Sequence, residues 1–191
     1  MIKDYPYYVF DKELPLELCQ EVIKLGEDAE VKRAMVYEDG KDKSDLGIRN
    51  NSISWLNYTE INTLLAVYAA RANKESGWDL DVEAFETPQF CRYEPGQYYD
   101  WHIDTGVDES EELLYRKLSI VVSLNENYTG GDFEMGMFCP PDSPNRSMKI
   151  PQLRNTGTIV VFPSFMYHRV APVDQGTRYS IVCWFRGPNF T

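Results

Sequence analysis

The stretch FCRYEPGQYYDWHID, residues 90–104, holds one of the chain's two histidines in a His-x-Asp step. Alternate residues of an extended strand point to the same face, so we expect His102 and Asp104 to present an imidazole and a carboxylate to one point while Ile103 faces away. The second histidine, His168, could add another imidazole. The alternative is that His102 is a packed or hydrogen-bonded core residue, as lone histidines in aromatic strands often are.

Length and composition predict one globular domain. The chain has 191 residues, of which 43% are hydrophobic and 14% aromatic. A chain of this kind can bury one sizeable core, so we expect a single domain over residues 1–191. Acidic residues outnumber basic ones by 30 to 19, and this surplus would repel nucleic-acid backbones and anionic membranes. We therefore expect neither nucleic acid nor a membrane as a partner.

The four cysteines are widely separated and form no Cys-x-x-Cys pair, which argues against a zinc ribbon or a disulfide framework. They are Cys19, Cys91, Cys139 and Cys183. Reduced thiols are typical of the cytoplasm, a compartment that also favours ferrous iron. The N-terminus has no long apolar region, and no run of about 18 apolar residues occurs. A soluble, cytoplasmic protein is expected.

Apolar residues at helical spacing predict two helices in the first half of the chain, at residues 14–27 and 57–77. Short strands separated by turn residues fill the second half, a pattern typical of a sandwich, a barrel or a jelly roll. The main predicted strands cover residues 85–93, 118–124, 158–162 and 177–185. The run LSIVVSL at 118–124 is continuously apolar, as in strands buried on both faces. We expect helices within about residues 14–77 to support a β core at about residues 85–187.

Two charged stretches are predicted to be solvated loops. Residues 38–47, EDGKDKSDLG, precede a predicted strand. Residues 105–112, TGVDESEE, directly follow the His-x-Asp step, where they could also form a mobile lid. Arg49 follows the first loop, and it could either meet a substrate there or lie in solvent.

Arg178 lies ten residues after His168, with the turn residues Pro172 and Gly176 between them. A strand, a turn and an antiparallel return would bring both side chains into one cavity. A guanidinium there would bind the far end of a dicarboxylate through two parallel hydrogen bonds, which a lysine cannot do. Two imidazoles and one carboxylate with open positions are, in turn, the recurring ligand set of non-haem Fe(II) oxygenases.

These residues in this order resemble the Fe(II)/2-oxoglutarate-dependent dioxygenase superfamily. RYEPGQYYDWHID resembles the Tyr-x-x-Gly-Gln-x-Tyr-x-x-His-x-Asp segment of its prolyl 4-hydroxylase-like branch. HRVAPVDQGTRYSIVCWF resembles that branch's His-x-x-x-Pro-Val-x-x-Gly-x-Arg/Lys ending. Gly130-Gly131-Asp132 is similar to its Gly-Gly-Glu turn, and FDKELPLELCQEVI is similar to the helix that precedes its core. The likeness covers nearly the whole chain.

The resemblance implies a double-stranded β-helix, a distorted jelly roll that is mainly β with flanking N-terminal helices. By position, His102, Asp104 and His168 would bind Fe(II), and Arg178 would bind the 5-carboxylate of 2-oxoglutarate. Further residues implied near this cosubstrate are Tyr93, Tyr99, Ser119 and Trp184. For the last two, plain core packing is an equal alternative. Arg49 matches a substrate-side arginine of prolyl 4-hydroxylases.

The implied cofactors are Fe(II), 2-oxoglutarate and O2, with ascorbate as a reductant for the iron. The implied reaction hydroxylates an unactivated carbon and releases succinate and CO2. Asp104 favours hydroxylation, because halogenating relatives have no carboxylate at that position. A peptidyl proline is the expected substrate, and a free amino acid or another small molecule is the rival. The alternative without catalysis is a jelly-roll module that only holds a metal, but such a module would not need Arg178.

Overall fold

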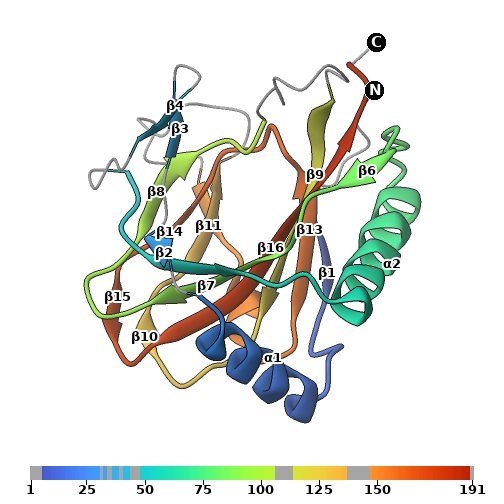
Figure 1. Ribbon diagram of the computed structural model, residues 1–191. Helices are drawn as coiled ribbons and strands as arrows, with labels where there is room; N and C mark the ends of the chain where they lie inside the picture. The colour runs from blue at the N-terminus through green and yellow to red at the C-terminus, as the bar shows by residue number, and fades with distance from the viewer. Residues whose placement is uncertain are drawn as a thin grey trace.

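The computed structural model describes residues 6–30, 32–33, 36–38, 41–43, 48–105, 114–136 and 147–189. Two antiparallel β-sheets face each other, and two helices cover the outer side of the larger sheet (Figure 1). The helices are α1 (Leu16–Asp28) and α2 (Thr59–Glu75), and η1 (Pro151–Arg154) is a short 3-10 helix. The predicted class, mainly β with N-terminal helices, is confirmed.

The larger sheet has the strand order β1, β13, β9, β16, β7, β5, β2. β6 pairs with Phe185 and Arg186, near the C-terminal end of β16. Its strands are β1 (Tyr8–Phe10), β2 (Lys32–Arg33), β5 (Ser52–Trp55), β6 (Ala84–Phe85), β7 (Gln89–Tyr93), β9 (Tyr115–Ser123), β13 (Ile159–Pro163) and β16 (Arg178–Gly187). The smaller sheet comprises, in order, β12 (Ser147–Lys149), β11 (Phe133–Gly136), β14 (His168–Val170) and β8 (Tyr99–His102). Two separate pairs are β3 (Val36–Glu38) with β4 (Lys41–Lys43), and β10 (Thr129–Gly130) with β15 (Val173–Gln175).

The neighbouring strands β9 and β13 are buried on both faces. Ile120 and Val122 of β9 pack into the core beneath the helices, whereas Val121 packs into the core between the two sheets. Val161 and Phe162 of β13 divide between the same two cores. Successive side chains of a strand point to opposite faces, so each apolar run of the sequence supplies both cores.

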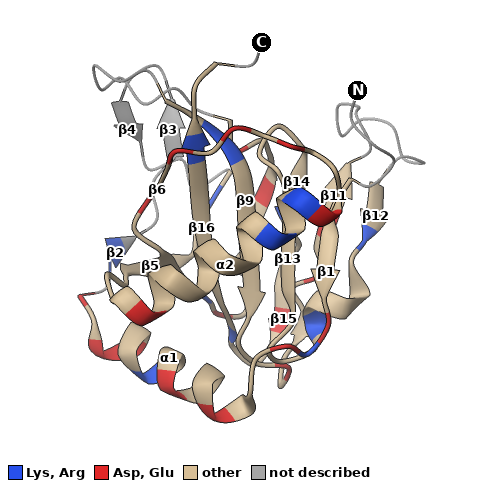
Figure 2. Ribbon diagram, turned by 90° about the vertical axis from the view of Figure 1, so that its right-hand side faces the viewer, with Lys and Arg blue, Asp and Glu red and all other residues tan. Residues whose placement is uncertain are grey.

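α1 approaches the sheet closely at Gly26. A Cβ atom at this position would lie 2.4 Å from the ring of Phe90 on β7, so only glycine fits without movement. The hydroxyl of Ser54 on β5 donates a hydrogen bond of 3.0 Å to the carbonyl of Gly26. Figure 2 shows both helices on this side of the larger sheet, with acidic residues, coloured red, along α1. No helix in the described part of the chain is long and apolar enough to cross a membrane.

Two element predictions differ from the structure. The single strand expected at residues 85–93 is divided into β6 and β7, and Pro88, which has no N–H for a sheet ladder, lies in the gap. Within the loop expected at residues 38–47, Lys41–Lys43 forms β4 and pairs with β3. The rest of that loop beyond Glu38, and the lid expected at 105–112 apart from Thr105, lie outside the described residues.

The hairpin predicted to join His168 to Arg178 is wrong. β14, which begins at His168, pairs with β8 and β11 in the smaller sheet, whereas β16, which begins at Arg178, pairs with β7 and β9 in the larger one. The residues between them form β15, which pairs with β10 instead. The chain therefore crosses from one sheet to the other between these two residues, and both residues line one cavity.

Candidate active site

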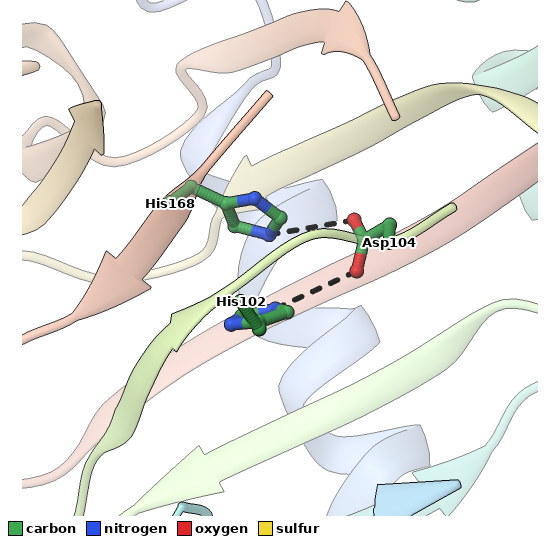
Figure 3. Close-up of side chains that lie close together, drawn as sticks. All are labelled: His102, Asp104 and His168. Carbon is green, nitrogen blue, oxygen red and sulfur yellow. Dashed lines mark ion pairs between the residues drawn. The ribbon is translucent and has the colours of Figure 1, made fainter. Parts of the chain in front are cut away.

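His102, Asp104 and His168 come together at one end of the space between the sheets (Figure 3). His102 ends β8 and His168 begins β14, and the two residues are directly opposite partners in the antiparallel ladder. Their ring centroids are 4.1 Å apart. The Asp104 carboxylate completes the group, with Oδ1 at 3.5 Å from Nε2 of His102 and Oδ2 at 3.4 Å from Nε2 of His168. Ile103 is 41% exposed, which agrees with the predicted alternation.

Backbone carbonyls fix the orientation of both imidazoles. Nδ1 of His102 is 2.7 Å from the carbonyl oxygen of Asp100, and Nδ1 of His168 is 2.9 Å from that of Met166. A carbonyl oxygen only accepts, so each Nδ1 carries a proton, and Nε2 of each ring faces Asp104. Burial, together with the neighbouring His102, lowers the pKa of His168 to about 4, which keeps this ring neutral at pH 7.

The three groups fit a metal ion. Burial of Asp104 by itself raises the pKa of its carboxyl, but His168 and His102 hold that pKa well below its usual range, so Asp104 is ionised. A carboxylate and the Nε2 atoms of two imidazoles then face one point, and Nε2 of His102 is buried without a hydrogen-bond partner among the described residues. Such an arrangement is unfavourable unless a cation lies among the three groups.

Arg178 is a buried guanidinium on the opposite sheet. The residue is 1% exposed, and its Nη1 donates a hydrogen bond of 2.9 Å to the hydroxyl of Ser180. Its Nη2 is buried and has no hydrogen-bond partner in the part of the chain that the structure describes. A Cβ atom on Gly131, whose φ is +61°, would lie 3.2 Å from Cδ of Arg178. An incompletely paired, buried cation is costly, so this group fits an anionic ligand such as a carboxylate.

All nine site residues predicted from the sequence line one cavity. They are Arg49, Tyr93, Tyr99, His102, Asp104, Ser119, His168, Arg178 and Trp184. The group of His102, Asp104 and His168 and the guanidinium of Arg178 thus line the same cavity, and their individual roles remain predictions. Apolar side chains, among them Val121, Phe133 and Val170, form much of the remaining wall.

The tyrosines of the cavity are neutral phenols. Tyr93 is 3% exposed and lies opposite Arg178 in the ladder, and burial raises the pKa of its hydroxyl far above the usual value. Burial likewise raises the pKa of Tyr99 to about 12. The Tyr99 ring stacks on the ring of His102, with centroids 3.5 Å apart and planes inclined by 12°. Tyr99 therefore contacts a predicted metal ligand. The sequence predicted a contact with the cosubstrate instead.

Arg49 is buried, so the alternative that placed it in solvent is wrong. It is 5% exposed, and its guanidinium donates to Asn51 Oδ1 at 2.7 Å and to Gln89 Oε1 at 2.6 Å. The same group lies 4.4 Å from the centroid of the Tyr99 ring. The His102 ring already covers one face of Tyr99, so the guanidinium covers the other. An isolated β-bridge pairs the backbone of Arg49 with that of Tyr99, so Arg49 lies directly beside β8.

Sequence reasoning missed three residues near the site. Ser164 hydrogen-bonds Ser119, whose hydroxyl in turn donates to Asp104 at 2.7 Å. Cζ of Arg116 lies 4.0 Å from the centroid of the Trp184 ring. The Arg116 guanidinium donates two hydrogen bonds of 2.6 Å to the carboxylate of Glu86. Strand alternation could have revealed Ser180, because it lies two residues after Arg178. No local pattern indicates Ser164 or the pairing of Arg116 with Glu86.

Comparison with known proteins identifies the family. The profile of the 2OG-Fe(II) oxygenase superfamily matches residues 88–186, just over half of the chain. The chain belongs to this superfamily. Membership implies Fe(II) and 2-oxoglutarate as cofactors, and the matched range contains eight of the nine predicted site residues, all except Arg49. The resemblance inferred from the motifs is confirmed.

Curated relatives include PKHD-type hydroxylases of cyanobacteria. That of Synechococcus elongatus is 31% identical over 98 residues, which are 50% of this chain and 40% of the relative. That of Crocosphaera subtropica is 32% identical over 98 residues, with the same coverage. The chain thus spans about 40% of the length of these relatives.

Solved structures establish the fold class. A prolyl-4-hydroxylase of Pseudomonas putida is 22% identical, with a TM-score of 0.71 over 97% of this chain and 94% of the other. The viral collagen prolyl hydroxylase of Paramecium bursaria Chlorella virus-1 is 20% identical, with a TM-score of 0.68 over 96% and 97%. At these identities the likeness concerns the fold, and it confirms the predicted double-stranded β-helix.

Proposed function

We propose that this protein is an Fe(II)- and 2-oxoglutarate-dependent hydroxylase. One observation carries the proposal: Nε2 of His102 and Nη2 of Arg178 are both buried without a hydrogen-bond partner among the described residues, and both residues line one cavity. The first atom needs a metal ion and the second needs an anion. A module that only holds a metal has no need of the second.

Each residue has a defined task in this proposal. His102, Asp104 and His168 hold the iron through two neutral imidazoles and one carboxylate. Arg178 binds the distal carboxylate of 2-oxoglutarate, and the protonated hydroxyl of Tyr93 donates a further hydrogen bond to it. The apolar wall excludes water from the space between them, which strengthens these polar contacts.

The bound iron and cosubstrate supply the oxidising chemistry: one O2 and one 2-oxoglutarate are consumed for each substrate C–H converted to C–OH, with release of succinate and CO2. The protein's residues contribute binding and orientation. Asp104 occupies a ligand position that would otherwise be open to a halide, so hydroxylation is the proposed outcome.

The proposed substrate is a peptidyl proline. Support comes from the fold, which resembles the Pseudomonas putida prolyl-4-hydroxylase and, with 18% identity and a TM-score of 0.66, a Trichoplax adhaerens prolyl hydroxylase in complex with a peptide fragment. A free amino acid is the second candidate. Arg49 favours it, because this buried cation lines the cavity, its described hydrogen-bond partners are neutral, and a free substrate carboxylate would complement its charge.

The proposed setting is the cytoplasm, with a reductant such as ascorbate keeping the iron ferrous. The thiols of Cys19, Cys91 and Cys183 are free and buried, which suits a reducing compartment. The net charge of −11 argues against nucleic acid as a partner.

The test is anaerobic addition of Fe(II) and 2-oxoglutarate. The wild-type protein should develop a visible charge-transfer band, and His168→Ala should abolish it. Arg178→Ala should weaken 2-oxoglutarate binding, whereas Arg92→Ala, at a partly exposed position paired with Glu94, should leave it unchanged. A wild-type protein that binds iron and 2-oxoglutarate without this band would contradict the proposal.

Substrate choice is tested by succinate release in air. Proline-containing peptides and free amino acids should be compared at equal concentrations, with succinate formed in the absence of substrate as the baseline. Stimulation by peptides alone supports a peptidyl proline. Stimulation by free amino acids alone, lost in Arg49→Met, supports the second candidate.

A further inference from the structure

Two buried hydroxyl groups lie behind the Asp104 carboxylate. Ser119 on β9 is 1% exposed, and its Oγ donates a hydrogen bond of 2.7 Å to Oδ2 of Asp104. Ser164, between β13 and β14, is fully buried, and its Oγ lies 3.0 Å from that of Ser119. Each hydroxyl has one proton to donate. The Ser119 proton is used on Asp104, so the Ser164 proton must be donated to Ser119.

Ser164 is itself held by three backbone hydrogen bonds. Its N–H donates to the carbonyl of Lys117 on β9 at 2.9 Å. Its carbonyl accepts from the N–H groups of Asp104 at 2.9 Å and Thr105 at 3.1 Å. Ser164 therefore connects β9 to the segment that carries Asp104. Ser164 also lies four residues before His168 in the sequence. A hydroxyl held in this way has a fixed position relative to the carboxylate.

We propose that Ser164 and Ser119 form a hydrogen-bond relay that keeps Asp104 a single-oxygen ligand of the metal. Oδ2 is engaged by the relay, and Oδ1 remains for the ion. A carboxylate with both oxygens free can bind a metal through both. Asp104 would then occupy one of the positions that the cosubstrate needs. This inference rests on the proposed function and assigns Ser119 and Ser164 as positioning residues.

The relay differs from the direct cosubstrate contact expected for Ser119. Ser119 lines the cavity, but Ser164 does not, so Ser164 can affect 2-oxoglutarate only through Ser119 and Asp104. The two roles also differ before any cosubstrate is added. Loss of the relay alters how Asp104 binds the metal even without 2-oxoglutarate. Loss of a direct contact between Ser119 and 2-oxoglutarate leaves metal binding without the cosubstrate unchanged.

The experiment uses Co(II) as the metal probe in the 191-residue chain. Ser119→Ala and Ser164→Ala remove the relay, and Ser119→Thr keeps its hydroxyl. Ser123→Ala is the matched control, because Ser123 is on the same strand, is 1% exposed and donates to the carbonyl of Asn125 instead. Measurements are the Co(II) dissociation constant, the visible Co(II) spectrum without 2-oxoglutarate, the 2-oxoglutarate dissociation constant of the Co(II) form, and thermal unfolding.

We expect both alanine variants to retain Co(II) affinity within about threefold of wild type while the 2-oxoglutarate dissociation constant rises about tenfold, the effect of losing a hydrogen bond to a charged group. The Co(II) spectrum should change in both, because the coordination of Asp104 changes. Ser119→Thr and Ser123→Ala should resemble the wild type in all these properties. If Ser164→Ala does not fold, the cosubstrate-free spectrum of Ser119→Ala still decides the matter.

Three results would overturn the relay. The first is wild-type behaviour of a folded Ser164→Ala protein. The second is weaker 2-oxoglutarate binding in Ser119→Ala with an unchanged cosubstrate-free spectrum, which would establish direct contact. The third is loss of Co(II) affinity in both variants, which would mean that the hydroxyls hold Asp104 in reach of the metal. Failure of the wild-type protein to bind Co(II) and 2-oxoglutarate would instead overturn the proposed function.

Discussion

Arg49, Tyr99 and His102 form a column of a guanidinium, a phenol ring and an imidazole. The guanidinium lies 4.4 Å from the centroid of the Tyr99 ring, and the opposite face of that ring stacks on His102 at 3.5 Å. The column restricts the imidazole to one plane, while the carbonyl of Asp100 fixes which nitrogen faces inward. The aromatic ring of Tyr99, more than its hydroxyl, should therefore matter for metal binding.

Two substitutions of Tyr99 separate the ring from the hydroxyl. Tyr99→Phe keeps the stack, so its Co(II) affinity should stay within about twofold of wild type. Tyr99→Leu loses an aromatic pair worth about 0.5–1.5 kcal/mol, so its Co(II) affinity should fall roughly two- to tenfold. Titration of the metal-free proteins measures both. Equal losses in the two variants would show instead that the hydroxyl is the important group.

For individual residues, the sequence predicted which side chains line the site but not the contacts that hold them there. His102, Asp104 and His168 were recognisable because each is a chemically distinctive residue in a spaced motif. Arg49 was ambiguous, because burial of an arginine after a charged loop depends on the pairing of distant strands. Ser164 left no signal, since a serine at a proline corner is common and its partners are remote in sequence.

Among the elements, α1 depends on one close contact with the larger sheet. Gly26 leaves no room for a methyl group against the Phe90 ring. Alanine is a better helix former than glycine by about 0.8–1.0 kcal/mol. Overpacking of a tight core costs about 1–3 kcal/mol, and this larger effect should decide the sign.

We therefore predict that Gly26→Ala lowers the free energy of unfolding by about 1 kcal/mol, the difference between these two effects. Urea unfolding monitored by circular dichroism measures it. Lys24→Ala, at an exposed position of the same helix, is the control and should change stability by less than about 0.5 kcal/mol. A stabilised Gly26→Ala protein would mean that Phe90 moves aside at little cost.

Tyr179 gives the same interface a dependence on alkaline pH. Burial and a hydrogen bond of 2.6 Å from its hydroxyl to Glu27 raise the pKa of Tyr179 to about 12. In the unfolded chain a tyrosine has a pKa of about 10. Because the folded state holds the proton more tightly, this contribution to stability is complete below about pH 10 and is lost as the pH rises toward 12.

We predict that the urea midpoint of wild type falls between pH 10 and 12 and that Tyr179→Phe shows a shallower fall. Tyr58→Phe, at an exposed position, controls for the loss of one phenol. Parallel curves for wild type and Tyr179→Phe would exclude this linkage.

Periodicity predicted the elements well where a strand or helix is long and uniform. α1, α2, β9 and β13 were expected because each has a clear apolar period or run. The hairpin between His168 and Arg178 was expected wrongly, because local turn residues do not reveal which strand is the partner. β14 finds its partners at β8 and β11, more than thirty residues earlier in the sequence.

For the whole molecule, the site joins the two sheets. His102 and His168 belong to the smaller sheet, whereas Arg178 and Tyr93 belong to the larger one. In the proposed function, a metal ion alone would be held mainly by the smaller sheet, whereas 2-oxoglutarate would also engage Arg178 of the larger one. Binding of both ligands should therefore stabilise the molecule in two separable steps.

We predict that Co(II) raises the melting temperature and that 2-oxoglutarate at about 100 times its dissociation constant adds about 2.7 kcal/mol, or roughly 5–10 °C. Arg178→Met should keep the first increment and lose most of the second. Arg92→Met is the control and should keep both. Thermal unfolding in the absence of oxygen measures these shifts, and a full second increment in Arg178→Met would contradict the assignment of Arg178.

The overall topology was less accessible to sequence reasoning than its parts. Strand and turn patterns alone favoured a sandwich, a barrel or a jelly roll without choosing among them. The choice came from the resemblance of the motifs to a known superfamily. The winding of the chain is set by contacts between distant strands, which no local pattern records.

β1 forms one edge of the larger sheet, where Tyr8–Phe10 pair with Ile159–Val161 of β13. Removal of residues 1–10 would remove β1 and leave the backbone N–H and C=O groups on one side of the apolar strand β13 open to solvent. Exposed edges of this kind pair with other molecules and promote aggregation. We therefore expect the short strand β1 to limit self-association, independently of any chemistry at the metal.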